Sequence, residues 1–315
     1  MGLYILKRCL YGLVTVWFIA TATFFAMHAL PGDPLAEDKA VSPEIRRNLE
    51  QYYGLDKPLY QQYARYLSNM ARGDLGVSFT QKNRSVNDIV AEHFPVSAAL
   101  GCLSLLFAAL GGVLWGGLAA RFRNRWPDNL IMLCVILFIS VPGFVLAALA
   151  QLSIVEINRW LGWTLLPVAG WGSLAHMWVP SIVLGLATMA YLARLTRASL
   201  LENSQQEYLR MARAKGLSRR RIFWHHELRN ALLPVVTVLG PAVAAVTTGG
   251  FVVELIFAIP GLGRYFVQAV QQLDYTVIMG TTVFYGAFLV LMVLLADIVY
   301  GLVDPRVSLA EADHV

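Results

Sequence analysis

The sequence predicts an all-α integral membrane protein, a fold class that rests on three observations. Hydrophobic residues make up 57% of the 315 residues and charged residues only 14%, whereas a soluble domain carries about 25% charged residues. The apolar residues gather in long runs, and a hydrocarbon core about 30 Å thick needs about 20 of them per helix. Lysine and arginine cluster between alternate runs, as expected of segments that stay in the cytoplasm. Lipid is therefore the main solvent of this chain.

Six runs are long enough to cross a bilayer, which predicts six transmembrane helices. They cover residues 9–30, 96–120, 129–152, 178–196, 231–253 and 277–303. The first run is too long for the h-region of a signal peptide, and it ends in Pro31-Gly32-Asp33-Pro34 rather than in a cleavage site. The N-terminal helix is therefore expected to remain in the membrane.

Proline and glycine inside these runs predict bends and close helix contacts. Pro142-Gly143 and Gly240-Pro241 fall in mid-run, where proline removes a backbone hydrogen bond. Gly111-Gly112 and Gly116-Gly117 form a small-residue face that allows two helices to approach closely.

The distribution of basic residues orients the chain. With the N-terminus inside, the cytoplasmic segments hold 15 lysines and arginines, whereas the two short outer loops hold only Arg159 and Arg264. Both termini are therefore expected in the cytoplasm. The chain divides into a first helix with an extracytoplasmic insertion (1–95), a five-helix core (96–304) with a cytoplasmic loop (197–230), and a cytoplasmic tail (305–315).

The insertion between residues 31 and 95 is predicted to be folded. Ser42 is placed as an N-cap before Pro43, the first residue of a helical run that Gly54 ends. A second amphipathic run, Tyr60–Met70, leads into Arg72-Gly73-Asp74-Leu75-Gly76, whose glycines suit a turn. A packed cap and a ligand-binding role are both compatible with this pattern.

The basic segment from Ser199 to Pro234 predicts two helices joined by a sharp turn. Ser199-Leu-Leu-Glu202 has the spacing of a capping box and starts the first helix. Gly216 is placed to take a positive φ at its end, and Ser218 to cap the next helix. That second helix is expected to bury Ile222, Phe223 and Leu228. We call this segment, residues 199–234, the elbow.

The motifs of an enzyme do not occur in the sequence. No phosphate loop (Gly-x-x-x-x-Gly-Lys-Ser/Thr), no His-Glu-x-x-His and no Gly-x-Ser-x-Gly is present. We therefore expect no enzymatic activity, no catalytic residue and no metal or cofactor bound by this chain. Cys9, Cys102 and Cys134 lie inside apolar runs without ligand spacing, which predicts buried free thiols.

An ion-coupled secondary transporter is the alternative of a different class. It requires ionisable residues deep in the membrane. Only Asp297 lies well inside a predicted span, with Glu254 and Arg194 near span ends. Asp297 fits a proton relay or a contact with a neighbouring helix.

The basic residues of the elbow are compatible with three roles. They could contact lipid headgroups, recognise anionic lipid or nucleic acid, or dock a protein partner.

Over essentially its whole length the chain resembles the permease subunits of bacterial ABC importers of the peptide class. The elbow is similar to their cytoplasmic coupling motif at Arg210–Gly216 and Leu228–Pro234. Arg210-Met211 replaces the Glu-Ala of the general motif, and Pro234 follows Gly216 by eighteen residues, as in the peptide and nickel branch. Other similar segments are 29–34, 73–78, 253–263, 274–279 and 296–306. Residues 85–90 and 94–98 most resemble the B-type oligopeptide permease.

This resemblance implies the fold of a type I ABC importer permease in the bacterial cytoplasmic (inner) membrane. The expected partners are a second homologous permease, two cytoplasmic ATPases that use ATP and magnesium, and an extracytoplasmic solute-binding protein, but no nucleic acid. ATPase closure would move the docked elbow as a rigid body and rock the attached helices. The expected solute is an oligopeptide, and dipeptides, nickel chelates and glutathione stay open as alternatives.

Two sets of residues carry the predicted function. Coupling to the ATPase is assigned to Arg210, Ala212, Arg213, Ala214, Lys215, Gly216, Leu217 and Ser218. The segment 254–263 predicts a re-entrant or interfacial turn at the outer face. It is either a packed loop or a gate and binding-protein contact formed by Glu254, Pro260, Gly261 and Gly263.

Overall fold

The structure is a computed structural model that describes residues 2–29, 54, 56–81, 84–248 and 250–303. These residues are mainly helical, and the only β pairing among them is an isolated bridge between Val77 and Ser85. The all-α prediction is confirmed. The chain forms two compact units, residues 1–97 with 260–291 (unit 1) and residues 98–259 with 292–315 (unit 2). The predicted helix after Ser42 lies outside the described residues.

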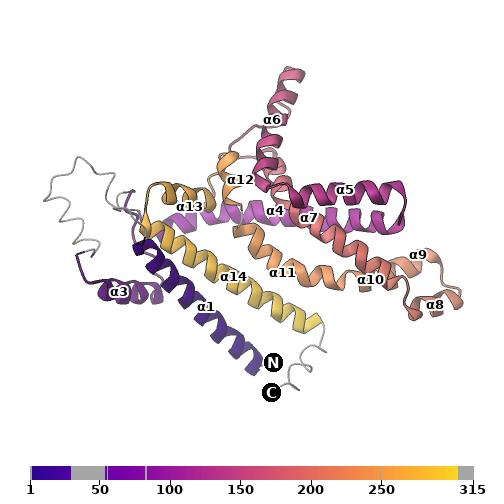
Figure 1. The fold of residues 1–315 in the computed structure, drawn as a ribbon, viewed down its shortest axis with the longest axis horizontal. Helices are drawn as coiled ribbons and strands as arrows, with labels where there is room; N and C mark the ends of the chain where they lie inside the picture. Colours follow the sequence, from indigo (N-terminus) through magenta and orange to yellow (C-terminus); the bar gives the residue numbers. More distant parts are fainter. Residues whose placement is uncertain (1, 30–53, 55, 82–83, 249, 304–315) are drawn as a thin grey trace. The chain divides into compact units, whose positions relative to one another are not determined.

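Unit 1 is built around the long N-terminal helix. Its elements are α1 (Gly2–Ala29), α3 (Leu59–Ala71), the start of α4 (Val86–Arg121), α13 (Leu262–Gln271) and the first part of α14 (Tyr275–Val303). In Figure 1, α1 and α14 run side by side. The glycines of this pair allow the approach, because a Cβ at Gly286 would lie 2.7 Å from Ile19 and one at Gly12 would lie 2.7 Å from Val290.

The amphipathic run of the insertion forms α3 as predicted, and aromatic side chains attach it to α1. Tyr66 stacks on Phe24 with ring centroids 5.5 Å apart, and the Tyr63 hydroxyl lies 2.7 Å from Thr21 Oγ1. Burial raises the pKa of Tyr66 to about 12, with a smaller contribution from Tyr63, so the phenol stays neutral. The predicted turn after α3 is also present, since Gly73 and Gly76 both have positive φ.

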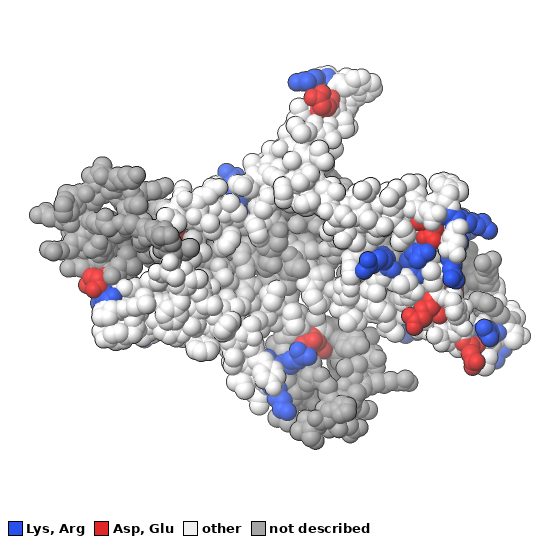
Figure 2. Space-filling model, viewed as in Figure 1, with Lys and Arg blue, Asp and Glu red and all other residues white. Residues whose placement is uncertain are grey.

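Unit 2 contains the remaining helices and the elbow. It consists of the rest of α4, α5 (Trp126–Ser140), α6 (Gly143–Leu161), α7 (Leu174–Asn203), α8 (Glu207–Ala214), α9 (Arg219–Ile222), the π-helix η1 (Phe223–Glu227), α10 (Leu228–Ala231), α11 (Leu233–Thr248), α12 (Phe251–Ile256) and the end of α14. Figure 2 shows Lys and Arg gathered over the α8–α10 end of this unit, whereas the helices leading to it carry little charge on the same face.

The predicted count of six spans is not confirmed. Within the described residues five helices are long and apolar enough to cross a membrane: Leu6–Ala29, Val86–Arg121, Gly143–Leu161, Leu174–Asn203 and Tyr275–Ile298. The run 129–152 is not one helix, because α5 ends at Ser140 and α6 begins at Gly143. Pro142 has no N–H to donate, and Val141 before it is extended at φ −85°, ψ 127°.

The run 231–253 is divided as well. Its longest element, α11, has 16 residues, and α12 begins separately at Phe251. At 1.5 Å per residue α11 extends about 24 Å, less than a hydrocarbon core of about 30 Å. Pro241 lies inside α11 without ending it. Hydropathy therefore located this apolar segment, but it overstated the length of the helix.

The cysteine prediction was correct about pairing and wrong about burial. All three thiols are free, but Cys102 is exposed and Cys9 and Cys134 are half-buried. The reason is that a helix in a membrane turns apolar residues outward as well as inward, so an apolar run does not imply protein on every side.

The predicted small-residue face of α4 packs directly on α7. A Cβ on Gly112 would lie 2.6 Å from the Leu192 Cβ, and one on Gly116 would lie 2.4 Å from the Ala193 carbonyl oxygen. The next glycine along, Gly117, has nothing within 4 Å of its Cβ position. Close contact between the two helices thus involves Gly112 and Gly116, together with Gly111 of α4 and Gly185 of α7, but not Gly117.

A matched pair of substitutions tests this contact. Gly116→Ala is expected to destabilise the protein by about 1–3 kcal/mol, because the added methyl group meets backbone that cannot move aside. Gly117→Ala is the control and is expected to stabilise by up to about 1 kcal/mol, since alanine favours a helix over glycine. Thermal unfolding in detergent measures both, and equal effects of the two substitutions would contradict the contact.

Candidate functional site

The elbow of unit 2 is a small folded element with an apolar core of its own. Leu209, Ala212 and Ile222 are buried, and Tyr208 and Leu217 pack against them. These side chains come from α8, from the turn and from α9. The two arms of the elbow are therefore joined by side-chain packing as well as by the chain.

The turn at the tip of the elbow has the predicted geometry. Gly216 takes φ +76°, and the Leu217 N–H donates to the Ala212 carbonyl at 3.3 Å. This six-to-one hydrogen bond is that of a Schellman motif, in which an apolar residue after the glycine contacts the last turn of the helix. Leu217 makes that contact. The turn is therefore fixed by a backbone bond and a buried side chain together.

Ser218 starts the second arm, as the sequence predicted. Its Oγ accepts the Arg221 N–H at 3.4 Å, and its carbonyl accepts the Ile222 N–H at 3.0 Å. The first arm differs from the prediction. Ser199 lies inside α7, which continues to Asn203, and α8 begins only at Glu207. The capping-box pattern at Ser199 failed because the apolar face of α7 continues through it, and Ser199 itself is buried.

The hydroxyl group of Tyr208 connects three parts of the elbow. It accepts the Asn230 Nδ2–H at 3.0 Å, and it lies 3.3 Å from Asn203 Oδ1 and 3.4 Å from the His226 carbonyl oxygen. These partners belong to α10, to the end of α7 and to the π-helix η1. No local pattern in the sequence marks Tyr208, since its partners lie up to 22 residues away.

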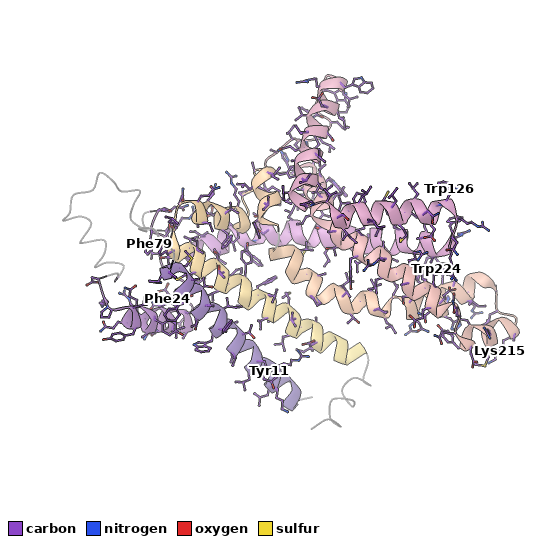
Figure 3. The ribbon with its side chains drawn as sticks, viewed as in Figure 1. Tyr11, Phe24, Phe79, Trp126, Lys215 and Trp224 are labelled. Atoms are coloured by element: carbon purple, nitrogen blue, oxygen red, sulfur yellow. The ribbon has the colours of Figure 1, made fainter. Side chains whose placement is uncertain are left out.

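A wide helical turn and an open hollow follow the tip. The π-helix Phe223–Glu227 joins α9 to α10, and such turns often occur at functional sites. Ser218, Arg221, Trp224 and His225 surround a surface hollow of about 590 Å³. The Trp224 side chain is 57% exposed. Figure 3 shows Lys215 at the outer end of the elbow.

The residues assigned to coupling divide into exposed and buried ones. Arg210, Ala214, Lys215, Gly216 and Ser218 are exposed, Leu217 is half-buried, and the Arg213 side chain lies outside the described set. Ala212 is 8% exposed and faces the core of the elbow. Within this chain, the surface open to a partner is therefore the tip around Lys215 and Gly216 together with Ser218.

The second set of predicted residues begins with α12, in unit 2. Glu254 is buried, and its carbonyl accepts the Ile259 N–H at 2.8 Å while Ala258 takes φ +52°. This is again a Schellman turn, here with an alanine in the left-handed position. The Gln151 Nε2–H donates to the Ile256 carbonyl at 3.0 Å, which attaches α6 to this turn.

The other three residues of that set lie in unit 1 and are held by α4. His93 Nδ1 lies 2.9 Å from the Pro260 carbonyl oxygen, and the Leu262 N–H donates to Ser97 Oγ at 2.9 Å. His93 and Ser97 are four residues apart and share one face of α4. Gly261 and Gly263 are buried between these contacts. The segment 260–263 is therefore packed against a helix at two points.

The surroundings of His93 hold its ring in one orientation. Because a carbonyl only accepts, the Nδ1 atom that faces Pro260 carries the hydrogen, and Nε2 then accepts from Arg84 Nη2 at 3.2 Å. Tyr265 stacks on the ring with centroids 4.0 Å apart. Arg84 also pairs with Glu92. The hydrogen bonds and the stacked ring fix the orientation of the His93 side chain.

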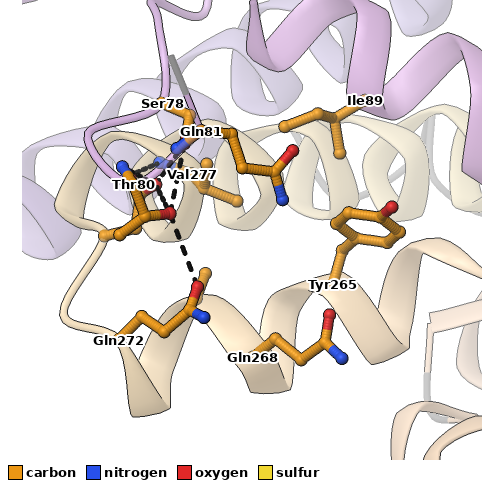
Figure 4. Close-up of a pocket in the computed structure, with 10 residues that line it drawn as sticks. Ser78, Thr80, Gln81, Ile89, Tyr265, Gln268, Gln272 and Val277 are labelled. Atoms are coloured by element: carbon orange, nitrogen blue, oxygen red, sulfur yellow. Dashed lines mark hydrogen bonds between the residues drawn. The ribbon is translucent and has the colours of Figure 1, made fainter. Parts of the chain in front are cut away.

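A polar corner of unit 1 lies around Asp274, between the end of α13 and the start of α14. Figure 4 shows the side chains of Ser78, Thr80 and Gln272 that gather at this corner. The buried carboxylate accepts hydrogen bonds from Ser78 Oγ at 2.5 Å, from Thr80 Oγ1 at 2.9 Å and from the Val277 N–H at 3.2 Å. It therefore caps α14 and binds the 78–80 segment at once. The adjoining cavity, lined by Gln81, Gln268 and Gln272 among others, holds about 10 Å³, the space of about one water molecule.

No group of three metal-ligating side chains comes together among the described residues. The polar groups of both regions are instead used in caps, turns and helix contacts. Sequence reasoning located the elbow and the segment 254–263, but it missed the roles of Tyr208 and His93, which hold these regions in place, and of Asp274, which joins α14 to residues 78–80.

A conservative substitution tests the connection made by Tyr208. Tyr208→Phe is expected to destabilise the elbow by about 1–2 kcal/mol, because the Asn230 amide loses its acceptor while the ring still packs. Faster backbone hydrogen exchange confined to residues 203–231 would be the sign of this loss. Tyr60→Phe is the control, since Tyr60 is 70% exposed. Unchanged exchange in Tyr208→Phe would show that the hydroxyl group adds nothing.

Known protein families and proteins match this chain over almost its whole length. Residues 112–309 match the family model described as the inner membrane component of binding-protein-dependent transport systems, and residues 1–101 match the N-terminal model of the membrane components of such systems. The chain is 45% identical over 310 residues to the dipeptide transport system permease protein DppB of Bacillus subtilis, covering 98% of this chain and 99% of that protein.

Other relatives extend the comparison. The oligopeptide transport system permease protein OppB of Haemophilus influenzae is 41% identical over 306 residues, covering 96% of this chain and 98% of that protein. Among solved structures, a chain of the MetNI methionine ABC transporter aligns with a TM-score of 0.52 at 16% identity, covering 69% of this chain and 96% of that chain. The likeness to the MetNI chain concerns the fold alone.

Proposed function

Since this chain belongs to the family of inner membrane components of binding-protein-dependent transport systems, we propose that it is the permease subunit of an ATP-driven importer that passes oligopeptides across the cytoplasmic membrane. The observation that carries the proposal is its likeness, over almost its whole length, to permeases of oligopeptide and dipeptide transport systems. The chain is a multi-pass inner membrane protein and not an enzyme.

The proposal includes partners that supply what this chain lacks. Two cytoplasmic ATPases would hydrolyse ATP with magnesium, a second homologous permease would complete the channel, and an extracytoplasmic solute-binding protein would deliver the peptide. Both termini would lie in the cytoplasm, which puts the basic elbow on the side of the ATPases. The elbow suits such a contact because its arms are joined by packing and by Tyr208.

The proposed mechanism follows from that rigidity. When the ATPase dimer closes on ATP, each docked elbow would move as one body, because its turn is fixed by the Leu217–Ala212 hydrogen bond and its arms share a core. The motion would then pass into α7 and α11, which continue from the two arms, and rock the helices around the pathway. The segment 254–263 would act at the outer face as a gate or as a contact for the binding protein.

A second candidate solute is a dipeptide, because a relative at 45% identity serves a dipeptide transport system. Nickel chelates and glutathione are less favoured alternatives. Uptake of labelled dipeptides and pentapeptides into proteoliposomes that contain the complete transporter and its binding protein separates the first two. Preferred uptake of pentapeptides supports the oligopeptide importer, whereas uptake of dipeptides alone supports the second candidate.

Affinity purification of the tagged chain tests the class of transporter. A complex with a second permease and two ATPases is expected. A chain that purifies alone and drives peptide uptake from a proton gradient would establish the secondary transporter instead.

Two substitutions at one position test the docking role of the elbow tip. Gly216→Ala and Gly216→Trp impose the same left-handed backbone on a residue with a Cβ, at a cost of about 1–2 kcal/mol. The space around Gly216 is open within this chain, with nothing within 4 Å of a Cβ. Only the bulky tryptophan is therefore expected to block a partner groove.

The expected result is that Gly216→Trp loses at least about nine-tenths of peptide uptake, as in loss of an interface anchor worth more than 1 kcal/mol. Membrane insertion should be retained, and Gly216→Ala should keep most uptake. Normal uptake by Gly216→Trp would refute the assignment of the tip as the ATPase contact.

A further inference from the structure

A partly buried ion pair lies at the base of the elbow, within unit 2. Arg197 Nε donates to Asp128 Oδ1 at 2.7 Å and Arg197 Nη2 donates to Asp128 Oδ2 at 2.8 Å. The Asp128 side chain is 2% exposed and that of Arg197 is 26% exposed. Two parallel bonds between a guanidinium and a carboxylate fix both distance and orientation. The pair joins the first turn of α5 to the last two turns of α7.

The carboxylate of Asp128 is held from a second direction. The Asn124 N–H donates to Oδ2 at 2.9 Å, and Asn124 takes the left-handed φ of +59° that turns the chain between α4 and α5. The hydrogen bond from Arg197 is the largest cause that lowers the pKa of Asp128, and the Asn124 bond adds to it while burial opposes both. The pair is therefore charged at neutral pH and would be lost only in acid.

Helix α4 meets the same turns of α7. A Cβ on Gly116 would lie 2.6 Å from the Thr196 Cβ and 3.1 Å from the backbone nitrogen of Arg197. Val135 of α5 packs with Ala190 and Ala193 of α7 in a small apolar cluster next to the ion pair. Three helices thus meet at residues 193–197. We call Gly112, Gly116, Asp128, Ala193 and Arg197 the clasp.

An unbroken helix connects the clasp to the elbow. Helix α7 continues from Arg197 to Asn203 without interruption. Asn203 donates from Nδ2 to the Ser199 carbonyl at 2.9 Å, and its Oδ1 lies near the Tyr208 hydroxyl. No proline or glycine occurs in α7 from Arg197 to Asn203, and the hydrogen bond of 3.3 Å between the Tyr208 hydroxyl and Asn203 Oδ1 spans the turn at 204–206 that joins α7 to α8. A displacement of the elbow therefore reaches Arg197 with little loss to bending.

We propose that Asp128 and Arg197 are positioning residues that transmit movement of the docked elbow from α7 to α5 and α4. This proposal rests on the proposed function, because it requires an ATPase that moves the elbow. The geometry supports transmission rather than anchoring alone. A bidentate pair resists rotation of α5 about α7, whereas the apolar cluster of Val135, Ala190 and Ala193 resists only separation.

The test measures peptide uptake and ATP hydrolysis in the complete transporter reconstituted in proteoliposomes. Both are measured in the same preparation, and the readout is the amount of peptide taken up per ATP hydrolysed. Arg197→Lys keeps the charge but cannot form two parallel bonds. We expect it to retain ATP hydrolysis within about twofold and to lower the uptake per ATP about tenfold, the size of effect found along coupled networks.

A second variant controls for misfolding caused by an unpaired charge. Asp128→Asn combined with Arg197→Gln removes both charges, so no unpaired charge is left buried. It is expected to assemble and to show the same lowered ratio. Glu156→Gln is the control, because Glu156 pairs with Arg159 at 3.2 Å with both side chains largely exposed, and it should leave the ratio unchanged.

The outcomes separate the two proposals. Uptake per ATP at the wild-type value in both clasp variants would overturn the role in transmission. If uptake and ATP hydrolysis both fell in proportion, the result would also show that the pair serves folding alone. Failure of the unaltered chain to support ATP-dependent uptake with its partners would instead overturn the proposed function.

Discussion

The close approach of α4 to α7 is the contact on which the arrangement of unit 2 depends. Gly112 and Gly116 let the two backbones come within van der Waals range, since a Cβ at either position would overlap Leu192 or Ala193. In a bilayer such packing has to hold helices together, because lipid tails are as apolar as the side chains. It brings α7 to the position at which Arg197 reaches Asp128, and the elbow then continues from α7. The elbow is thus an extension of a packed helix.

In both units the chain changes direction at the ends of helices through the same local motif. Left-handed residues at Gly216, Ala258 and Leu273 each follow a helix, and the N–H of the next residue bonds back to the last turn at 2.8–3.3 Å. Carbonyl groups at a helix end need partners, and this device supplies them without water. Only one of the three positions is glycine. The alanine and the leucine accept backbone strain of about 1–2 kcal/mol each, which surrounding contacts offset.

The sequence predicted those parts of the site that local signals determine. Gly216 and Ser218 mark the elbow because each acts within five residues, and both predictions are confirmed by φ and by hydrogen bonds. The signal at Ser199 is equally local, yet burial in α7 overrode it. Pro142 predicts a bend within the run 129–152, but the average hydropathy of that run does not indicate that a helix ends there.

The remaining features depend on partners far along the chain. Arg197 and Asp128 are 69 residues apart, and Asp274 and Ser78 are 196 apart. Each residue alone is an ordinary charged or polar group near the end of an apolar run, and only the fold selects its partner. The segment 260–263 shows the same limit, because its contacts with His93 and Ser97 bring together residues 167 and 165 positions apart.

The use of an ion pair at the base of the elbow carries the functional argument further. Stability alone does not require it, because well-packed apolar residues of similar volume commonly hold helices as well as a buried pair does. The apolar contacts of Val135 with Ala190 and Ala193 already do so within about two turns of the pair. What the pair adds is a fixed angle between α5 and α7, at the last point of α7 before the chain leaves the bundle for the elbow. A subunit that only had to remain folded would gain little from that angle, whereas one that transmits a rigid-body movement depends on it.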